Sequence, residues 1–363
     1  MNKISICTVC MNRLMHLRET LPMNIAQNKD HGNIEFVVLD YNSGDGMEDW
    51  VKSNMQEHID SGVLKYFKTY EPKYFNLSHS KNMAMRLGSG NILCLIDADN
   101  FAGHNYANWI SSVFDAQGGN TIITTLHKDR ILYRDQGGKL CFNRELFYRV
   151  KGFDEALTGY GIDDVDLVRR VEKAGGNRYF IEDEKFLQFI GHSLEERLRN
   201  YPIYHKLEKM YMLVTENREQ KNGILFLFND KTFYEVTFNY NEHMKNNLVE
   251  TYHGWTIGEH GLRTGLFNYK DNKLVLRFEG NEERVLDNKD PLLYSHHNGE
   301  SSAWTQIARN DGNYLELIMA YGECINRKKY MKNEVGGKSV NDNGWGKGTV
   351  YMNFDMNTPL VIN

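Results

Sequence analysis

Cysteine is scarce in this sequence, and the scarcity limits both its chemistry and its compartment. Five cysteines are scattered over 363 residues, too few for a disulfide framework, which favours a cytoplasmic protein with reduced thiols. Cys7 and Cys10 have the spacing of a redox or zinc motif. However, they fall inside an expected strand, and no second Cys or His pair lies nearby. We interpret them as buried strand cysteines.

Long apolar runs and an excess of basic residues are also missing. No stretch of the sequence is apolar for long enough to span a bilayer. The formal net charge is -5, whereas a protein that binds nucleic acid without sequence preference would carry a basic surface. The chain leads directly into an apolar strand, so we expect no secretory signal. These absences predict a cytoplasmic protein that binds no nucleic acid and makes at most peripheral contact with the inner face of a membrane.

The first third of the chain alternates between two kinds of hydrophobic pattern. Short apolar segments are separated by segments in which apolar residues recur at helical spacing. The expected strands are residues 4–10, 35–40, 64–67 and 92–96, and the expected helices begin near residues 13, 47, 78 and 106. This alternation predicts a Rossmann-like α/β domain with a mainly parallel sheet.

The pattern changes after residue 120. We expect strands at 121–126 and 131–134, helices at 143–150 and 163–174, and polar helices through 193–220. From residue 223 onward, alternating aromatic residues and turn signals indicate a second, β-rich domain. The predicted domains are therefore 1–222 and 223–363. The second domain holds Trp255, Trp304 and Trp345, and it is open whether it binds a glycan, forms an oligomer interface or is a structural extension.

Polar side chains follow several expected strands. Asn12 and Arg13 come after the first strand, Asp40 and Asn42 after the second, and Asp97 and Asp99 after the buried strand 92–96. In an open α/β sheet, ligands bind beyond the carboxyl ends of the strands. Two acids directly after an apolar strand are costly unless a cation meets them. Mg²⁺ or Mn²⁺ shared with a diphosphate would do so, whereas a lone D-x-D is as readily a turn or a helix cap.

A second acidic group opens the helix expected at 163–174. Asp164 shares the inward face of this helix with its apolar residues, and the helix N-terminus stabilises an ionised carboxylate there. Such a group can act as a general base. Asp163 is either a helix cap or a group that binds acceptor hydroxyls, and Tyr160 either stacks on an acceptor ring or packs the loop. His192 follows the strand-like segment 186–190, where it is either a structural hydrogen-bonding group or a metal ligand.

Together these residues resemble nucleotide-diphospho-sugar transferases of the GT-A fold. The likeness covers about residues 1–215 and is closest to bacterial family 2 glycosyltransferases and to the C-terminal region of galactosyltransferases. Residues 37–46 look like the second-strand segment whose aspartate, here Asp40, binds uracil. Asn12-Arg13 lies in the place of the first nucleotide-binding turn. Residues 78–84, with Lys81 and Asn82, resemble the helix start near the diphosphate.

The remaining motifs of the resemblance concern the metal and the acceptor. Asp97-Ala98-Asp99 looks like the family's D-x-D, with Asp99 as the direct metal ligand and Asp97 contacting the metal or the ribose. Residues 151–155 followed by 159–164 look like the acceptor motif, whose second acid is the base. His192-Ser193 resembles the histidine-serine metal site of galactosyltransferases. The sequence departs from the family where Ile162 replaces a glycine and Asp163 a glutamate.

The resemblance implies transfer of a hexose or N-acetylhexosamine from a UDP-sugar to a glycan or lipid-linked oligosaccharide. It implies a Mn²⁺ or Mg²⁺ cofactor, an inverting displacement and a place in surface polysaccharide synthesis, with retention also open. Two rivals are a sugar-phosphate nucleotidyltransferase and a non-catalytic glycan-binding protein. The first usually has a glycine-rich loop after the first strand, where this chain has Cys10-Met11-Asn12-Arg13. The donor sugar, the acceptor and the oligomeric state are not predicted.

Overall fold

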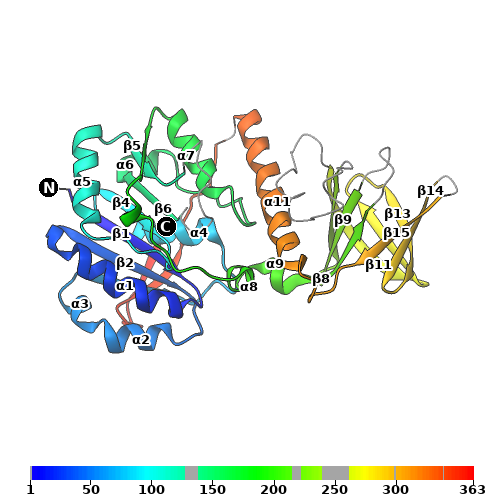
Figure 1. The fold of residues 1–363 in the computed structure, drawn as a ribbon, viewed down its shortest axis with the longest axis horizontal. Helices are drawn as coiled ribbons and strands as arrows, with labels where there is room; N and C mark the ends of the chain where they lie inside the picture. The colour runs from blue at the N-terminus through cyan, green and yellow to red at the C-terminus, as the bar shows by residue number, and fades with distance from the viewer. Residues whose placement is uncertain (1, 127–137, 215–221, 239–260, 298–299, 338) are drawn as a thin grey trace. The chain divides into compact units, whose positions relative to one another are not determined.

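The structure is a computed structural model that describes residues 2–126, 138–214, 222–238, 261–297, 300–337 and 339–363 (Figure 1). The expected strand at 131–134 and Trp255 lie outside these residues. The chain divides into two compact units. One contains Met1–Ser193 together with Lys329–Asn363, and the other contains Leu194–Lys328.

The first unit is built on a nine-stranded sheet in the order β17-β16-β3-β2-β1-β4-β6-β5-β7. Every strand except β6 and β16 points the same way, which confirms the predicted mainly parallel α/β sheet. The strands are β1 (Ile4–Cys10), β2 (Ile34–Tyr41), β3 (Leu64–Thr69), β4 (Ile92–Ile96), β5 (Thr121–Thr124), β6 (Lys139–Asn143), β7 (Asn177–Phe180), β16 (Gly348–Met352) and β17 (Pro359–Ile362).

Helices cover both faces of this sheet, because its strands are apolar on both sides. One buried cluster joins alternate strand residues such as Phe36 and Val38 to helices α1, α2, α3 and α5. The opposite cluster joins Val37 and Leu39 to helices α4, α6 and α7. These helices are α1 (Leu14–Asn28), α2 (Met47–Asn54), α3 (Gln56–Asp60), α4 (Leu77–Leu87), α5 (Tyr106–Gln117), α6 (Arg144–Arg149) and α7 (Asp163–Lys173), with short 3-10 turns at Lys29–His31 and Glu184–Phe186.

The second unit is dominated by an eight-stranded antiparallel sheet that closes on itself, which confirms the β-rich prediction. Its interior is filled by aromatic and aliphatic side chains, including Phe233, Phe278 and Trp304. The strands are β8 (Leu207–Leu213), β9 (Asn222–Phe228), β10 (Thr232–Phe238), β11 (Gly261–Lys270), β12 (Lys273–Phe278), β13 (Glu283–Lys289), β14 (Leu292–His297) and β15 (Glu300–Gln306). The helices outside the first unit's layers are α8 (Leu194–Leu198), α9 (Pro202–Lys206) and α11 (Tyr314–Gly336).

The division of the chain differs from the predicted boundary at residue 222. The closed sheet already begins with β8, inside the segment where we expected polar helices. At the other end, β16 pairs with β3 and β17 pairs with β16, so the last residues complete the first sheet. Such a return is not visible in hydrophobic periodicity, because a strand's pattern does not say which sheet it joins. None of the helices in the described part of the chain combines the length and apolar character of a membrane span.

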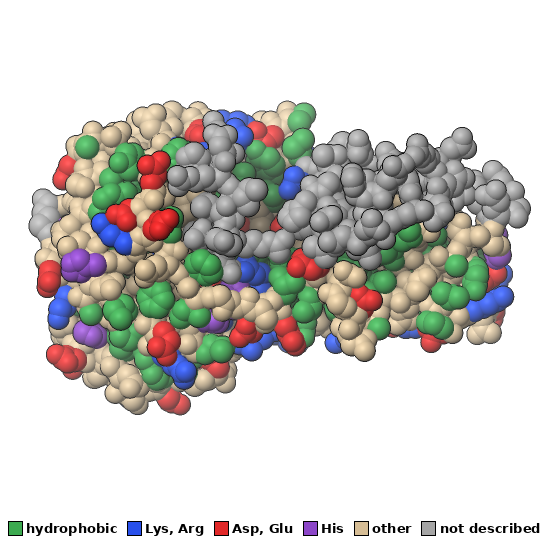
Figure 2. Space-filling model, in the orientation of Figure 1, with side chains coloured by type: hydrophobic (Ala, Val, Ile, Leu, Met, Phe, Trp, Pro, Cys, Tyr) green, Lys and Arg blue, Asp and Glu red, His purple; other side chains and the backbone are tan. Residues whose placement is uncertain are grey.

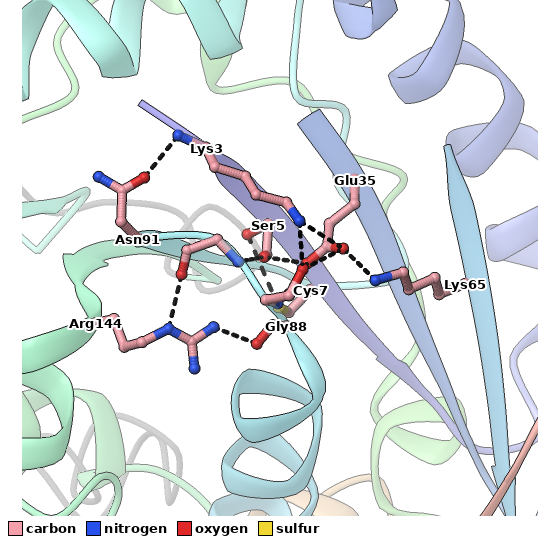
Figure 3. Close-up of polar contacts among 10 residues, drawn as sticks. Lys3, Ser5, Cys7, Glu35, Lys65, Gly88, Asn91 and Arg144 are labelled. Atoms are coloured by element: carbon pink, nitrogen blue, oxygen red, sulfur yellow. Dashed lines mark hydrogen bonds and ion pairs between the residues drawn. The ribbon is translucent and has the colours of Figure 1, made fainter. Parts of the chain in front are cut away.

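A buried carboxylate anchors the amino-terminal edge of the first sheet (Figure 3). Glu35 accepts hydrogen bonds from Ser5 Oγ at 2.6 Å and from Ser89 Oγ at 2.8 Å, and Lys65 Nζ lies 2.6 Å from its other oxygen. Burial alone would raise the pKa of Glu35, but these partners outweigh it and lower the pKa to about 2. Glu35 thus links the first residues of β1, β2 and β3 to the turn that precedes β4.

The turn that Glu35 holds connects two elements important for the predicted site. Residues 88–90 join α4, which carries Lys81, to β4, which leads into Asp97. Arg144 secures the same turn by donating to the carbonyls of Gly88 and Gly90 (Figure 3). A side chain at residue 90 would place its Cβ 2.6 Å from the carbonyl oxygen of Lys3, so this close approach requires glycine.

Replacing Glu35 should destabilise the first unit in a pH-dependent way. Glu35→Gln removes a buried charge that Lys65 and Ser89 stabilise, so we expect a loss on the order of 2 kcal/mol in the free energy of unfolding at pH 7. Because the folded pKa lies below the ordinary value, the difference should be full above about pH 5 and shrink as the pH falls toward 2.

Urea denaturation at several pH values measures this difference. The matched control is Glu19→Gln, which removes a carboxylate with a mostly exposed side chain from α1 and should change stability by less than about 0.5 kcal/mol. Equal effects of the two variants, or a Glu35→Gln effect that does not depend on pH, would contradict the structural role of Glu35.

Candidate active site

The residues predicted to bind the donor gather at the carboxyl ends of three neighbouring strands. The strand order places β1 between β2 and β4, and these three strands are parallel. Asn12 and Arg13 follow β1, Asn42 follows β2, and Asp97 and Asp99 follow β4. The polar strand ends therefore meet at one edge of the sheet, as the general rule for ligand sites in such sheets requires.

Asp99 and His192 form a buried pair, although 93 residues separate them in the sequence. His192 Nε2 lies 2.8 Å from Asp99 Oδ2, and the Arg13 guanidinium lies 3.6 Å from the same oxygen. The backbone brings them together: Asn100 forms a β-bridge with Phe189, and the amide of Ile190 donates to the carbonyl of Asp99 at 2.8 Å. The segment that leads to His192 is thus bonded through its backbone to the loop that carries Asp99.

The charge state of Asp99 suits a metal ligand. Burial would raise the pKa of Asp99, but the hydrogen bond and charge of His192 and the charge of Arg13 outweigh it and hold that pKa below its usual range. Within the described residues, no three His, Cys, Asp or Glu side chains form a cluster suited to a metal ion. A carboxylate and an imidazole still fit Mn²⁺ or Mg²⁺, because Mg²⁺ usually keeps waters and is bound by one or two carboxylates and substrate phosphates.

Asp97 has a different environment from Asp99. Burial raises the pKa of Asp97 to about 7, repulsion from Asp99, Asp164 and Asp163 adds to the rise, and Lys81 opposes it. The Asp97 amide donates to the carbonyl of Gly138 at 3.2 Å. A Cβ at residue 138 would lie 1.9 Å from the Asp97 carboxylate, so glycine is needed there. Asp97 therefore responds electrostatically to both acidic groups predicted from the sequence.

Lys81 joins α4 to the start of α7. Its ammonium lies 2.7 Å from Asp163 Oδ2 and 2.8 Å from Asp164 Oδ1, and it stands 4.9 Å from the centre of the Phe153 ring. Burial would lower the pKa of Lys81, but the two aspartates and Asp97 raise it well above the ordinary value. The structure thus places Lys81 against the predicted acceptor-side acids, whereas the sequence indicated the diphosphate.

Asp163 and Asp164 differ in their access to solvent. The side chain of Asp164 is 22% exposed and that of Asp163 only 4%. Burial and repulsion from Asp163 raise the pKa of Asp164 to about 6, and Lys81 limits the rise. Asp164 is therefore the more accessible acid, and its role as a base stays a prediction, whereas Asp163 is a buried partner of Lys81 with little surface for an acceptor. Ile162, which replaces the family's glycine, has a left-handed φ of 71°, a strained conformation for a β-branched residue.

Two residues predicted to bind the nucleotide are committed to the protein itself. Asn82 is fully buried, donates to the Phe153 carbonyl at 2.9 Å and accepts from the Phe153 amide at 2.8 Å. Asp40 is also fully buried and accepts from the Ser43 amide at 2.7 Å and the Tyr66 hydroxyl at 2.6 Å. Both side chains are without exposed surface in this conformation, so their contact with a nucleotide stays a prediction. Their types and positions suit the family pattern, but burial depends on packing that sequence order does not reveal.

The other predicted residues lie on partly exposed loops. Asn12 and Asn42 both adopt left-handed backbone conformations, with φ values of 54° and 60°. Asn12 Oδ1 accepts from the Gly44 amide at 2.7 Å, and Asn42 donates to the Pro72 carbonyl at 2.8 Å. These bonds shape the loops at the ends of β1 and β2. Tyr160 is half-buried in the loop before α7, where its contact with an acceptor stays a prediction.

Lys139, at the start of β6, was missed by sequence reasoning. It is fully buried and donates to the Phe186 carbonyl, and burial lowers its pKa to about 7 despite the attraction of Cys141, Asp97 and Asp99. The signal that could have indicated this buried lysine is its position directly before the apolar residues 140–142.

Contacts from the last residues of the chain were also missed. Asn341 donates to the carbonyls of Lys151 and Phe153 at 2.7 and 2.6 Å, and the Gly346 amide donates to Glu155 at 2.6 Å. These bonds hold the loop before the acceptor motif. Nothing in the local sequence indicates them, because the partners lie almost 200 residues apart.

Removing the Lys81 ammonium should strongly destabilise the first unit. Lys81→Met leaves the buried Asp163 and the largely buried Asp164 without their counter-charge, so we expect a loss of about 3–5 kcal/mol in the free energy of unfolding. Lys173→Met is the matched control, because Lys173 forms an exposed pair with Glu334 on the same unit and should contribute no more than about 1 kcal/mol. Urea denaturation of both variants tests this, and a similar loss in the two would argue against the buried Lys81 pair.

Comparison with known proteins gives one match to a family model. Residues 121–213 match the family model described as the N-terminal domain of galactosyltransferase. No curated protein matches the chain. The matched residues include α7, with Asp163 and Asp164, and His192.

Solved structures that match part of this chain include a mannosyltransferase, TarS and a galactosyltransferase. The mannosyltransferase PcManGT from Pyrobaculum calidifontis is 23% identical with a TM-score of 0.41, over 50% of this chain and 55% of that one. TarS (residues 1–349) from S. aureus is 16% identical with a TM-score of 0.41, over 50% and 58%. Drosophila β1,4-galactosyltransferase 7 is 14% identical with a TM-score of 0.39, over 56% and 75%. The chain thus spans little more than half the length of the first two. The family match supports, over residues 121–213, the resemblance recognised in the sequence.

Proposed function

We propose that this chain is a metal-dependent glycosyltransferase that moves a hexose or N-acetylhexosamine from a UDP-sugar to a glycan hydroxyl with inversion. The observation that carries the proposal is the electrostatic position of Asp97 between two groups. The pKa of Asp97 responds to Asp99 on one side and to Lys81 and Asp164 on the other. The donor-side pair and the acceptor-side carboxylate are therefore both near enough to Asp97 to influence its charge.

On the donor side, Asp99 and His192 would hold the cation. A divalent cation bound there would offset the negative charge that develops on the departing diphosphate. The Arg13 guanidinium, 3.6 Å from Asp99, is placed to contact a phosphate oxygen in the same region. Asn12 and Asn42 lie at the ends of β1 and β2, where the nucleoside would bind. We assign Asp40 and Asn82 to shaping these loops and not to contacting the donor.

On the acceptor side, Asp164 would act as the general base. As an acceptor hydroxyl attacks the anomeric carbon, its proton passes to the Asp164 carboxylate, the new glycosidic bond forms and the bond to the diphosphate breaks. Lys81 holds Oδ1 of Asp164 at 2.8 Å, which fixes the carboxylate without closing it to solvent. A pKa of about 6 suits this task, because a general base works best when its pKa lies near the working pH.

The proposal also covers the acceptor, the biological process and the place of action in the cell. We propose a glycan or lipid-linked oligosaccharide acceptor, surface polysaccharide synthesis as the process, and a cytoplasmic site of action with at most peripheral membrane contact. The closed sheet of the second unit is proposed to bind the acceptor glycan, since exposed tyrosine faces such as that of Tyr269 suit sugar rings. Mn²⁺ and Mg²⁺ both suit the paired carboxylate and imidazole.

Release of the nucleoside diphosphate tests the reaction directly. The full chain with Mn²⁺ should hydrolyse at least one member of a panel of UDP- and GDP-sugars slowly and release UDP or GDP, and EDTA should stop the release. Pyrophosphate release from UTP and a sugar phosphate would instead favour a nucleotidyltransferase. No turnover of any donor, with intact binding of glycans, would favour a non-catalytic protein. The anomeric configuration of a transfer product decides between inversion and retention.

With the best donor and acceptor, Asp164→Asn should lower the transfer rate by about 10²–10⁴-fold, the usual contribution of a general base. UDP binding in Mn²⁺ should not change. Asp163→Asn is the matched control, because it removes the neighbouring carboxylate that also contacts Lys81 but has little exposed surface. Asp163→Asn should retain clearly more activity, and full activity in Asp164→Asn would remove Asp164 as the base.

The rate of sugar transfer should also fall as the pH drops below about 6. Asp164 accepts a proton only when it is ionised, so kcat/KM should fall about tenfold for each pH unit below its pKa. The charged groups around it are Asp163 on the same helix, Lys81 from α4, and Asp97 beyond β4. Removing the Asp163 charge should lower the pKa of Asp164, so the acid limb of Asp163→Asn should move to lower pH. A limb in the same place in that variant would contradict the assignment.

A further inference from the structure

A row of buried polar side chains runs along one face of α1. The row consists of His16, Thr20, Asn24 and Asn28, which are between 2% and 4% exposed. Residues four apart lie above one another on a helix, so the four side chains form a single line. Apolar neighbours Leu17, Leu21 and Ile25 pack into the core beside it. Buried polar groups need partners, and Thr20, Asn24 and Asn28 find partners in residues 98–107.

Thr20 and Asn24 bind the backbone on both sides of Asp99. Thr20 Oγ1 donates to the carbonyl of Ala98 at 2.7 Å. Asn24 Nδ2 donates to the carbonyl of Asn100 at 3.1 Å, and Asn24 Oδ1 accepts from the amide of Ala102 at 2.7 Å. The residue before Asp99 and the residue after it are therefore both tied to α1.

The two ends of the row extend this arrangement. Asn28 donates to the carbonyl of Gly103 at 3.0 Å and accepts from the amide of Ala107 at 2.9 Å, which secures the loop up to the start of α5. At the other end, the ring of His16 packs edge-on against the ring of His192, with their centres 5.7 Å apart. One helix face thus contacts the surroundings of both Asp99 and His192.

These contacts add to the backbone bonds that the loop between β4 and α5 makes with residues 188–190. Ala98, Asn100 and Ala102 are buried, so their backbone groups cannot rely on water. The side chains of α1 bond the carbonyls of Ala98 and Asn100 and the amide of Ala102, and they leave the loop little freedom to change its path. Ligands for a cation must be held within a fraction of an ångström, and groups behind the ligands usually provide that precision.

We propose that Thr20 and Asn24 are positioning residues that set the Asp99 backbone for cation and diphosphate binding, with His16 supporting His192. The inference rests on the proposed function, because it assigns the loop's purpose to a metal-dependent donor site. It adds that the amino-terminal helix, and not only the motif after β4, determines the affinity of that site.

The test is calorimetric titration of the full chain with UDP, in Mn²⁺ and again in EDTA. Thr20→Val keeps the size of the side chain and removes the hydroxyl, and it should weaken UDP binding in Mn²⁺ by about tenfold, the lower end for groups behind metal ligands. Binding in EDTA should change little, because the nucleoside contacts remain. Thr20→Ser restores the hydroxyl and should restore affinity to within about twofold of the original. Thr20→Ala replaces Thr20→Val if the latter does not fold.

Thr121→Val is the matched control. It removes a buried hydroxyl from the same unit, bonded to the Gln117 carbonyl, away from the row on α1. Its affinity for UDP in Mn²⁺ should equal that of the original chain. If Thr20→Val binds UDP in Mn²⁺ as tightly as the original chain, or if Thr121→Val is equally weakened, the positioning role is wrong. If the original chain itself binds UDP no better in Mn²⁺ than in EDTA, the proposed metal-dependent function fails instead, and the inference built on it fails too.

Discussion

The cost of holding four carboxyl groups near one another beyond a buried sheet governs the arrangement of this site. The chain meets the cost by giving three of the four acids basic partners. Asp99 is held by His192 and Arg13, and Asp163 and Asp164 are held by Lys81. Asp97, between the two sets, has its pKa raised to about 7. A divalent cation would therefore enter a region that already has an excess of negative charge, which favours its binding.

The precision of the arrangement comes mainly from backbone contacts made by side chains elsewhere. The row on α1 fixes the path of residues 98–107, and the bridge between Asn100 and Phe189 extends that path to His192. The turn at residues 88–90, held by Glu35 and Arg144, sets α4 and β4 relative to each other at the opposite edge. Each of these devices satisfies buried backbone groups, so stability and site geometry depend on the same hydrogen bonds.

Sequence reasoning predicted the sheet, the strand ends and the inward position of Asp164, because periodicity and residue order carry that information. It also placed His192 beside the acids through a family resemblance. It did not anticipate that Asp40, Asn82 and Lys81 are buried and bonded to neighbours, because periodicity does not reveal such packing. It missed the polar row on α1, although polar residues at every fourth position of an amphipathic helix were a visible signal. The return of β16 to the first sheet left no local signal.

That return has a consequence for how the chain comes to be folded. β16 lies beside β3 in the sheet, yet about 280 residues of chain, including the whole second unit, are made between them. Loop closure over such a separation is slow compared with local pairing. During synthesis, the β3 edge and the loop bound by Asn341 must therefore wait until residues 341–352 have left the ribosome, while the closed sheet can already form. Within the first unit, the acceptor side of the site is expected to acquire its final shape late.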